Sequence, residues 1–215
     1  MKKMIFKIAS AMVLATNVAM AIPKGVQEAR QAAISLLWLD RNHEAWRAIC
    51  SGSFIKINGQ TYVLTAGHCV DEFPNGSYGA ILSNDDTVDL KLESYSFAWP
   101  IADYALFKVV DKDQDAIKAI KPLNVGTLLH TIGEQVFMWS GPLGTRINYY
   151  EGYYSGKMGF ADSPSEIDDM DWVVISATFG SSGTVVLNAD GEAVGILVGG
   201  FNGLVGTFLA ELPRE

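Results

Sequence analysis

The chain has 215 residues, of which 49% are hydrophobic and 19% are charged, a balance that excludes a disordered or fibrous protein. Its formal net charge of −8 argues against nucleic acid or anionic lipid as a partner, because an acidic surface is repelled by both. The length suits one two-lobed enzyme or two small domains.

Residues 1–21 have the features of a secretory signal peptide. Two early lysines form a charged start, residues 8–18 are apolar, and Ala19-Met20-Ala21 offers a cleavage site with small residues. The apolar stretch is short for a bilayer span, and an uncleaved N-terminal anchor is the alternative. We expect the leader to be removed, the protein to be secreted or periplasmic, and no stable membrane insertion afterwards.

Residues 22–33 predict an N-terminal arm or short helix, and the rest of the chain predicts strands. Short β-type runs alternate with turn residues and show no strand–helix alternation, which indicates an all-β barrel or sandwich. The weakly patterned stretch 113–122 is the predicted linker between a first β-domain at 34–112 and a second at 123–215. The expected strands are 34–39, 54–57, 62–65, 79–82, 88–92, 104–110, 135–139, 145–154, 171–177, 184–187, 194–198 and 207–212.

The most informative segment runs from Cys50 to Cys69, the only two cysteines. A strand, a turn at Asn58-Gly59 and a second strand lead to a small-residue loop that carries His68. A redox pair or a metal site is the alternative to a disulfide. The cysteines are not spaced as Cys-x-x-Cys, and no second Cys/His pair completes a zinc site, so we expect no metal.

Two further polar residues follow downstream. Asp103 precedes the alternating run 104–110, and Ser182 lies in the glycine-rich turn Phe179-Gly180-Ser181-Ser182-Gly183. Taken singly, each motif has an ordinary explanation: an aspartate that ends a loop, a plain glycine-serine turn, a core or surface histidine. Together they offer a nucleophile, a base and a group to orient the base.

These motifs resemble the chymotrypsin-like (trypsin-like) serine proteases over roughly residues 34–213. The order His68, Asp103, Ser182 is that of the chymotrypsin group, not of subtilisin or the α/β-hydrolases. The resemblance implies two antiparallel Greek-key β-barrels, with the active site in the cleft between them. The first barrel would carry His68 and Asp103, and the second Ser182. It also implies a Cys50–Cys69 disulfide beside the histidine loop.

The resemblance gives each residue a role. His68 would take the proton of Ser182 during attack on the peptide carbonyl and return it to the leaving amine. Asp103 would hold the imidazole in one tautomer. The backbone N–H groups of Gly180 and Ser182 would form the oxyanion hole.

The chain departs from the family pattern around the nucleophile. Ser181 replaces the aspartate that pairs with a new N-terminal amine in zymogens, so we expect no activating cleavage beyond leader removal. Thr184 stands where the family has glycine. Ser176 replaces an acid at the base of the specificity pocket, which argues against a preference for Arg or Lys. The other expected pocket walls, which predict an open site for a small or apolar side chain, are Val198, Gly199, Gly200 and Gly206.

These features predict a secreted serine endopeptidase that acts on protein or peptide substrates through an acyl-enzyme and uses no cofactor. A catalytically silent binding protein of the same fold is the alternative, but the presence of all three candidate residues favours the enzyme. We expect a monomer. The acidic stretch 165–171 is predicted to be a solvated loop, because it lacks the ligand spacing and glycine of a calcium motif.

Overall fold

The computed structural model describes residues 21–42, 44–98, 102–127, 129, 131–158, 170–200, 207–210 and 212–213, with residues 207–210 described by backbone only. The first half contains α1 (Lys24–Ala29), η1 (Arg30–Ala32), β1 (Ala33–Asp40), β2 (Ala45–Ile57), β3 (Gln60–Thr65), η2 (Gly67–Cys69), β4 (Tyr78–Leu82), β5 (Thr87–Ala98) and β6 (Ala102–Val109). The second half contains η3 (Asp111–Ile117), β7 (Gln135–Ser140), η4 (Pro142–Gly144), β8 (Asn148–Met158), β9 (Met170–Ile175), β10 (Val185–Leu187), β11 (Ala193–Gly200) and β12 (Thr207–Ala210).

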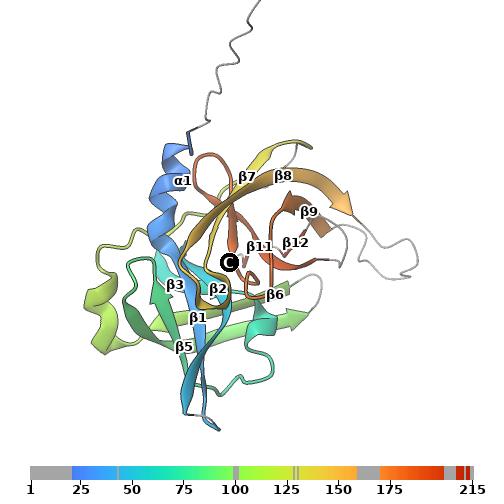
Figure 1. Ribbon diagram of the computed structural model, residues 1–215. Helices are drawn as coiled ribbons and strands as arrows, with labels where there is room; N and C mark the ends of the chain where they lie inside the picture. The colour runs from blue at the N-terminus through green and yellow to red at the C-terminus, as the bar shows by residue number, and fades with distance from the viewer. Residues whose placement is uncertain are drawn as a thin grey trace, which may run out of the picture.

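The strands close into two antiparallel barrels, which confirms the predicted all-β two-barrel fold. The first has the strand order β1-β2-β3-β6-β5-β4 and the second β10-β11-β12-β9-β8-β7. Figure 1 shows the first barrel in blue to green and the second in yellow to red. Closure leaves no unpaired strand at either end of the sheet.

Strand β6 shows how the sequence specifies a barrel wall. Asp103, Ala105, Phe107 and Val109 are buried, and the residues between them are partly exposed. Because successive side chains of a strand point to opposite faces, this alternation turns one face to the core. An aspartate therefore begins the inward row.

The β2–β3 hairpin carries one half-cystine and leads to the histidine. Its turn residues Asn58 and Gly59 have φ angles of 50° and 77°. Positive φ at both positions suits the tight turn that matches the twist of paired strands. Strand β2 begins at Ala45, well before the expected start at 54, because its outer end pairs with β1 from Ala45↔Asp40 onward while remaining exposed. This end lacks the apolar run by which the inner end was predicted.

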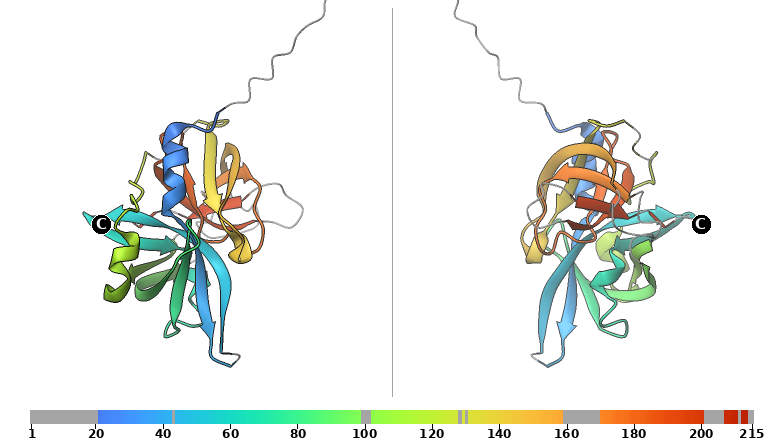
Figure 2. Two further views of the ribbon diagram at one scale, coloured as in Figure 1. Left: turned by 60° about the vertical axis from the view of Figure 1, so that its left-hand side comes forward. Right: turned by 90° about the vertical axis from the view of Figure 1, so that its right-hand side faces the viewer.

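The N-terminal helix α1 lies against the second barrel, although the strand that follows it belongs to the first (Figures 1 and 2). The indole Nε1–H of Trp139 on β7 donates to the Val26 carbonyl at 2.6 Å. Gly25 approaches the 190–191 turn so closely that a Cβ there would lie 2.0 Å from the Asp190 carbonyl oxygen. Val26 is fully buried.

The connection between the barrels is tied to both. It begins with η3, and isolated bridges then join Leu123 to Ile55 of β2 and Val125 to Ala193 of β11. One hydrophobic cluster includes side chains of both barrels, such as Phe54 and Ile196, so the barrels share packed surface.

Within the described ranges, no helix is long and apolar enough to span a membrane.

Candidate active site

The histidine loop is fixed at two points. A disulfide joins Cys50 of β2 to Cys69 of η2, which confirms the predicted bridge. On the other side, a Cβ on Gly67 would lie 2.0 Å from the Ser96 carbonyl oxygen of β5. Only glycine permits this close backbone approach. His68 stands between these two anchors.

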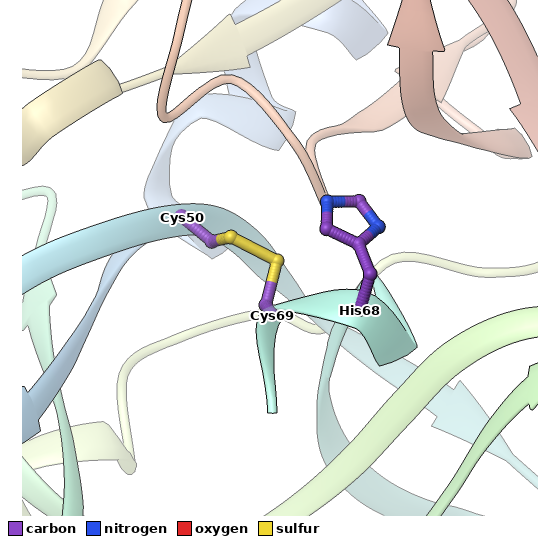
Figure 3. A group of neighbouring side chains, drawn as sticks. All are labelled: Cys50, His68 and Cys69. Carbon is purple, nitrogen blue, oxygen red and sulfur yellow. A yellow bond between two sulfur atoms is a disulfide. The ribbon is translucent and has the colours of Figure 1, made fainter. Parts of the chain in front are cut away.

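The imidazole of His68 stands beside the bridge (Figure 3). The ligand atoms of Cys50, His68 and Cys69 lie within 4.8 Å of one another and form the one such cluster among the described residues. Both sulfurs are bonded to each other, however. A thiolate is the metal-binding form of cysteine, so the oxidised cluster offers a metal only the imidazole.

His68 and Asp103 form a doubly hydrogen-bonded pair. The backbone N–H of His68 donates to Asp103 Oδ1 at 2.8 Å, and His68 Nδ1 lies 2.8 Å from Oδ2. The Asp103 side chain is fully buried, whereas that of His68 is 29% exposed. A buried carboxylate that accepts two hydrogen bonds fixes both the loop backbone and the ring, and requires the proton of the neutral imidazole to be on Nδ1. Nε2 is then free to act as a base.

The turn that carries Ser182 requires two glycines. Gly180 and Gly183 have φ angles of 86° and 83°, a region that suits glycine. Within the turn, the Ser181 N–H donates to the Thr178 carbonyl and the Thr184 N–H to the Ser181 carbonyl. The Ser181 side chain is buried, and its hydroxyl oxygen accepts from the Thr178 N–H at 3.2 Å.

The Ser182 turn lies directly against the first barrel. The backbone N–H of Ser51, next to Cys50, donates to the Ser182 carbonyl at 2.8 Å. A Cβ on Gly183 would lie 2.1 Å from Thr65 Oγ1 and 2.7 Å from the Ala66 backbone nitrogen. The turn thus sits within van der Waals contact of the segment that leads into the His68 loop. All three candidate catalytic residues gather where the barrels meet.

Ser182 and His68 are not hydrogen-bonded to each other. Among the described residues, no hydrogen bond joins the Ser182 hydroxyl to the His68 ring, whose Nδ1 contacts Asp103. The N–H groups of Gly180 and Ser182 likewise have no acceptor within the described part of the chain. Unliganded sites often hold catalytic contacts loosely, and free N–H groups are what an oxyanion hole needs.

The residues expected to line the specificity pocket differ in exposure, and one of them is not described. Ser176 is exposed in the loop after β9, Val198 is buried, and Gly199 and Gly200 end β11 at a register shift against β12. Gly206 and most of the acidic stretch 165–171 lie outside the described residues. The pocket itself is therefore only partly described.

Large apolar side chains surround the site, and the sequence motifs did not single them out. The ring centroid of Phe97 lies 6.2 Å from that of His68, and Phe97 is 46% exposed. Phe179 precedes Gly180 and is 86% exposed, and Leu143, whose backbone packs on Gly180, is 63% exposed. Only their closeness in sequence to Asp103 and Ser182 could have indicated Phe97 and Phe179.

A family model described as a trypsin-like peptidase domain matches residues 50–196, a range that begins at the first half-cystine and includes His68, Asp103 and Ser182. No curated protein sequence matches the chain. Two crystal structures of the inactive form of the M. tuberculosis protease Rv3671c have similar folds, each at 15% sequence identity.

The first, a serine-to-alanine mutant, has a TM-score of 0.64, with 91% of this chain and 88% of that chain covered. The second has a TM-score of 0.65, with coverages of 89% and 92%. At this identity the likeness supports the fold, while the family match extends over most of the chain. On that evidence, together with the buried His–Asp pair beside the glycine-bounded serine turn, this chain belongs to the trypsin-like serine peptidases.

Proposed function

We propose that the protein is a secreted endopeptidase whose catalytic triad is His68, Asp103 and Ser182. One observation carries the proposal: the buried Asp103 carboxylate binds both the backbone and the ring of His68, on a loop that abuts the Ser182 turn. A structural histidine would not need a buried anionic partner that fixes its tautomer, because burying a carboxylate is costly. A general base does need one.

In the proposed reaction, the Ser182 hydroxyl attacks the carbonyl carbon of a peptide bond while His68 Nε2 takes its proton. The negative charge that develops on the carbonyl oxygen is bound by the N–H groups of Gly180 and Ser182. The imidazolium returns the proton to the leaving amine, and Ser182 remains acylated. Water then hydrolyses the ester by the same steps, with His68 again as base.

Apolar substrate side chains fit the surroundings of the site better than charged ones. Phe97, Leu143 and Phe179 are exposed near the proposed catalytic groups, where a bound peptide would cover them. Ser176 supplies no charge for an Arg or Lys substrate. We therefore propose peptides with small or apolar residues before the cleaved bond as the preferred substrates.

The proposed site of action is outside the cytoplasm. The Cys50–Cys69 disulfide is compatible with an oxidising compartment. Residues 1–20, which carry most of the expected leader, lie outside the described residues. Export therefore rests on their sequence pattern and on the disulfide.

A fluorophosphonate probe tests the nucleophile. It should label the wild-type protein at one serine, and Ser182→Ala should abolish labelling and reduce kcat/KM on an apolar peptide substrate by about 10⁴-fold or more. The matched control is Ser155→Ala, which removes an exposed serine of β8 in the same barrel and should label normally. Peptide mapping of the labelled protein identifies the serine.

Each outcome is decisive for the proposal. If Ser182→Ala were still labelled, at another serine, that serine would be the nucleophile and our assignment of Ser182 would be wrong. A correctly folded wild-type protein that neither reacts with the probe nor cleaves peptides would instead be a catalytically silent member of the family.

A further inference from the structure

Buried hydroxyl groups converge behind the Ser182 turn. Ser51 from β2, Ser140 from β7 and Thr184 from the turn itself are each fully inaccessible to solvent. Ser140 Oγ lies 3.0 Å from Ser51 Oγ and 2.9 Å from Thr184 Oγ1. The cluster thus joins both barrels to the segment that carries the proposed nucleophile. We call it the hydroxyl cluster.

Two members of the cluster bind carbonyl groups of the turn. Ser51 Oγ donates to the Gly180 carbonyl at 2.9 Å, and Thr184 Oγ1 lies 2.7 Å from the Ser181 carbonyl. A carbonyl only accepts, so each of these contacts uses the single proton of its hydroxyl. Ser140 keeps its own proton, which it can donate to Ser51. All three hydroxyls therefore have an acceptor.

The geometry of a peptide bond connects these contacts to the oxyanion hole. In a planar trans peptide, the C=O and N–H bonds point in opposite directions. The Ser181 carbonyl shares a peptide group with the Ser182 N–H, so holding the carbonyl inward on Thr184 aims the N–H outward. The Ser51 bond to the Gly180 carbonyl restrains the preceding peptide group, whose N–H belongs to Ser181 and donates to the Thr178 carbonyl.

The bond from Thr184 also polarises the peptide group that carries the Ser182 N–H. Thr184 Oγ1 donates to the Ser181 carbonyl at 2.7 Å, and the Thr184 side chain is buried. A hydrogen bond is stronger in a low-dielectric interior than in water. Polarising the carbonyl makes the N–H of the same amide a stronger donor, which is the property that stabilises a developing oxyanion.

We propose that Ser51, Ser140 and Thr184 are positioning residues. They hold the Ser182 turn in the shape that directs its N–H groups toward the substrate carbonyl oxygen. This inference rests on the proposed peptidase function. It gives a reason for Thr184, where the family pattern has glycine, and for an ordered turn without a carboxylate at Ser181. The turn is held by uncharged groups that are present as soon as the two barrels have packed together.

Thr184→Val tests the proposal because valine keeps the shape of threonine and removes the hydroxyl. We expect kcat to fall by about 10-fold to 100-fold with KM nearly unchanged, somewhat less than the loss of a whole oxyanion donor. Inhibition by a peptide boronate, whose tetrahedral adduct occupies the hole, should weaken by a similar factor. Thr184→Ser should restore kcat to within about threefold of wild type, because it returns the hydroxyl.

Ser35→Ala is the matched control. Ser35 is a buried serine of β1 that donates to the carbonyl of Gly141, the residue after Ser140, at 2.8 Å, and among the described residues it makes no hydrogen bond to the turn. It should lower the melting temperature about as much as Thr184→Val while leaving kcat per titrated active site near wild type. If Thr184→Val also retained wild-type kcat per titrated site, the proposal would be overturned and the cluster would be merely structural.

Amide hydrogen exchange provides a test that needs no activity. Thr184→Val should increase exchange within residues 178–184 severalfold, whereas Ser35→Ala should leave this segment protected. Unchanged exchange would overturn the positioning role. If the wild-type protein proved inactive, the proposed function would fail, and the exchange result would still decide how the turn is held.

Discussion

Asp103 occupies a place in the inward row of β6 where the neighbouring positions carry apolar side chains. Its two carboxylate oxygens accept different hydrogen bonds, one from the His68 backbone N–H and one from the ring. An asparagine of the same shape has a single acceptor oxygen, so it can accept only one of these bonds and places its NH₂ against the other donor. We expect Asp103→Asn to reduce kcat by about 10⁴-fold with little change in KM.

Circular dichroism and thermal unfolding of Asp103→Asn should show a folded protein, since the volume of the side chain is conserved. Asp86→Asn, in an exposed turn, is the control and should leave kcat unchanged. Near-normal activity of Asp103→Asn would remove Asp103 from the catalytic set while leaving the fold assignment intact.

Tyr78 provides a pH-dependent prediction. Burial, with a smaller contribution from the nearby Tyr95, raises the pKa of Tyr78 to about 12, and its hydroxyl donates to the Phe73 carbonyl at 2.7 Å. The unfolded phenol ionises near pH 10, so folding favours the protonated form. The resulting stability is complete below pH 10 and is lost as pH rises toward 12, by about 2 to 3 kcal/mol in total.

Urea unfolding of Tyr78→Phe between pH 8 and 11 tests this linkage. At pH 8 the variant should be about 1 kcal/mol less stable, because it lacks the hydrogen bond. Above pH 10 its free energy of unfolding should fall less steeply than that of wild type. The control is Tyr153→Phe, at a half-exposed position, whose plot of unfolding free energy against pH should follow that of wild type. If the plot for Tyr78→Phe ran parallel to that of wild type, the loss of stability above pH 10 would not come from Tyr78.

Strand β2 connects the two halves of the site. Cys50 binds the histidine loop through the disulfide, and the backbone N–H of the next residue, Ser51, donates to the Ser182 carbonyl. We expect the double variant Cys50→Ala/Cys69→Ala to lose about 3 kcal/mol of stability, as predicted for closing a loop of this size in the chain-entropy model. Its kcat should fall because the His68 loop is less restrained.

Chemical denaturation measures the first effect and active-site-titrated kinetics the second. Treating the wild-type protein with a dithiol reductant should reproduce both changes, and treating the double variant should do nothing further. A reductant effect of equal size in the variant would show that the bridge is not its cause.

The sequence predicted those elements whose signal is local. The turn at Asn58-Gly59, the buried row of β6 and the glycines beside Ser182 each follow from the residues at those positions. The outer end of β2 was not predicted, because its exposed residues are strand only through pairing with β1. Ser51 and Ser140 were missed for a related reason: their role depends on contacts between elements distant in sequence.

The described contacts of the N-terminal segment from Ile22 to Ala29 are with residues outside the Ser182 turn. The Gln27 side chain donates to the Ile22 carbonyl, and α1 packs on β7 and the 190–191 turn. Ser181 presents an uncharged, hydrogen-bonded hydroxyl, so burying an ammonium beside it would be unfavourable. The conformation of the Ser182 turn should therefore not depend on a free α-amine at the N-terminus of the mature protein.

We expect a protein extended by a few residues before Ile22 to hydrolyse a small peptide ester at nearly the rate of one that begins at Ile22. The comparison needs both proteins purified and titrated for active sites. A loss of about a hundredfold or more, comparable to losing an oxyanion donor, would show that the N-terminus orders the site after all.

The docking of α1 also limits when the chain can complete its folding. A chain is made from its N-terminus, yet the partners of Gly25 and Val26 are Asp190 and Trp139, which are made much later. The first barrel can pair its strands among near neighbours, whereas the helix must wait for most of the second to appear. Helix α1, which is synthesised before either barrel, is thus among the last elements to reach its native place, and it docks only once both barrels exist.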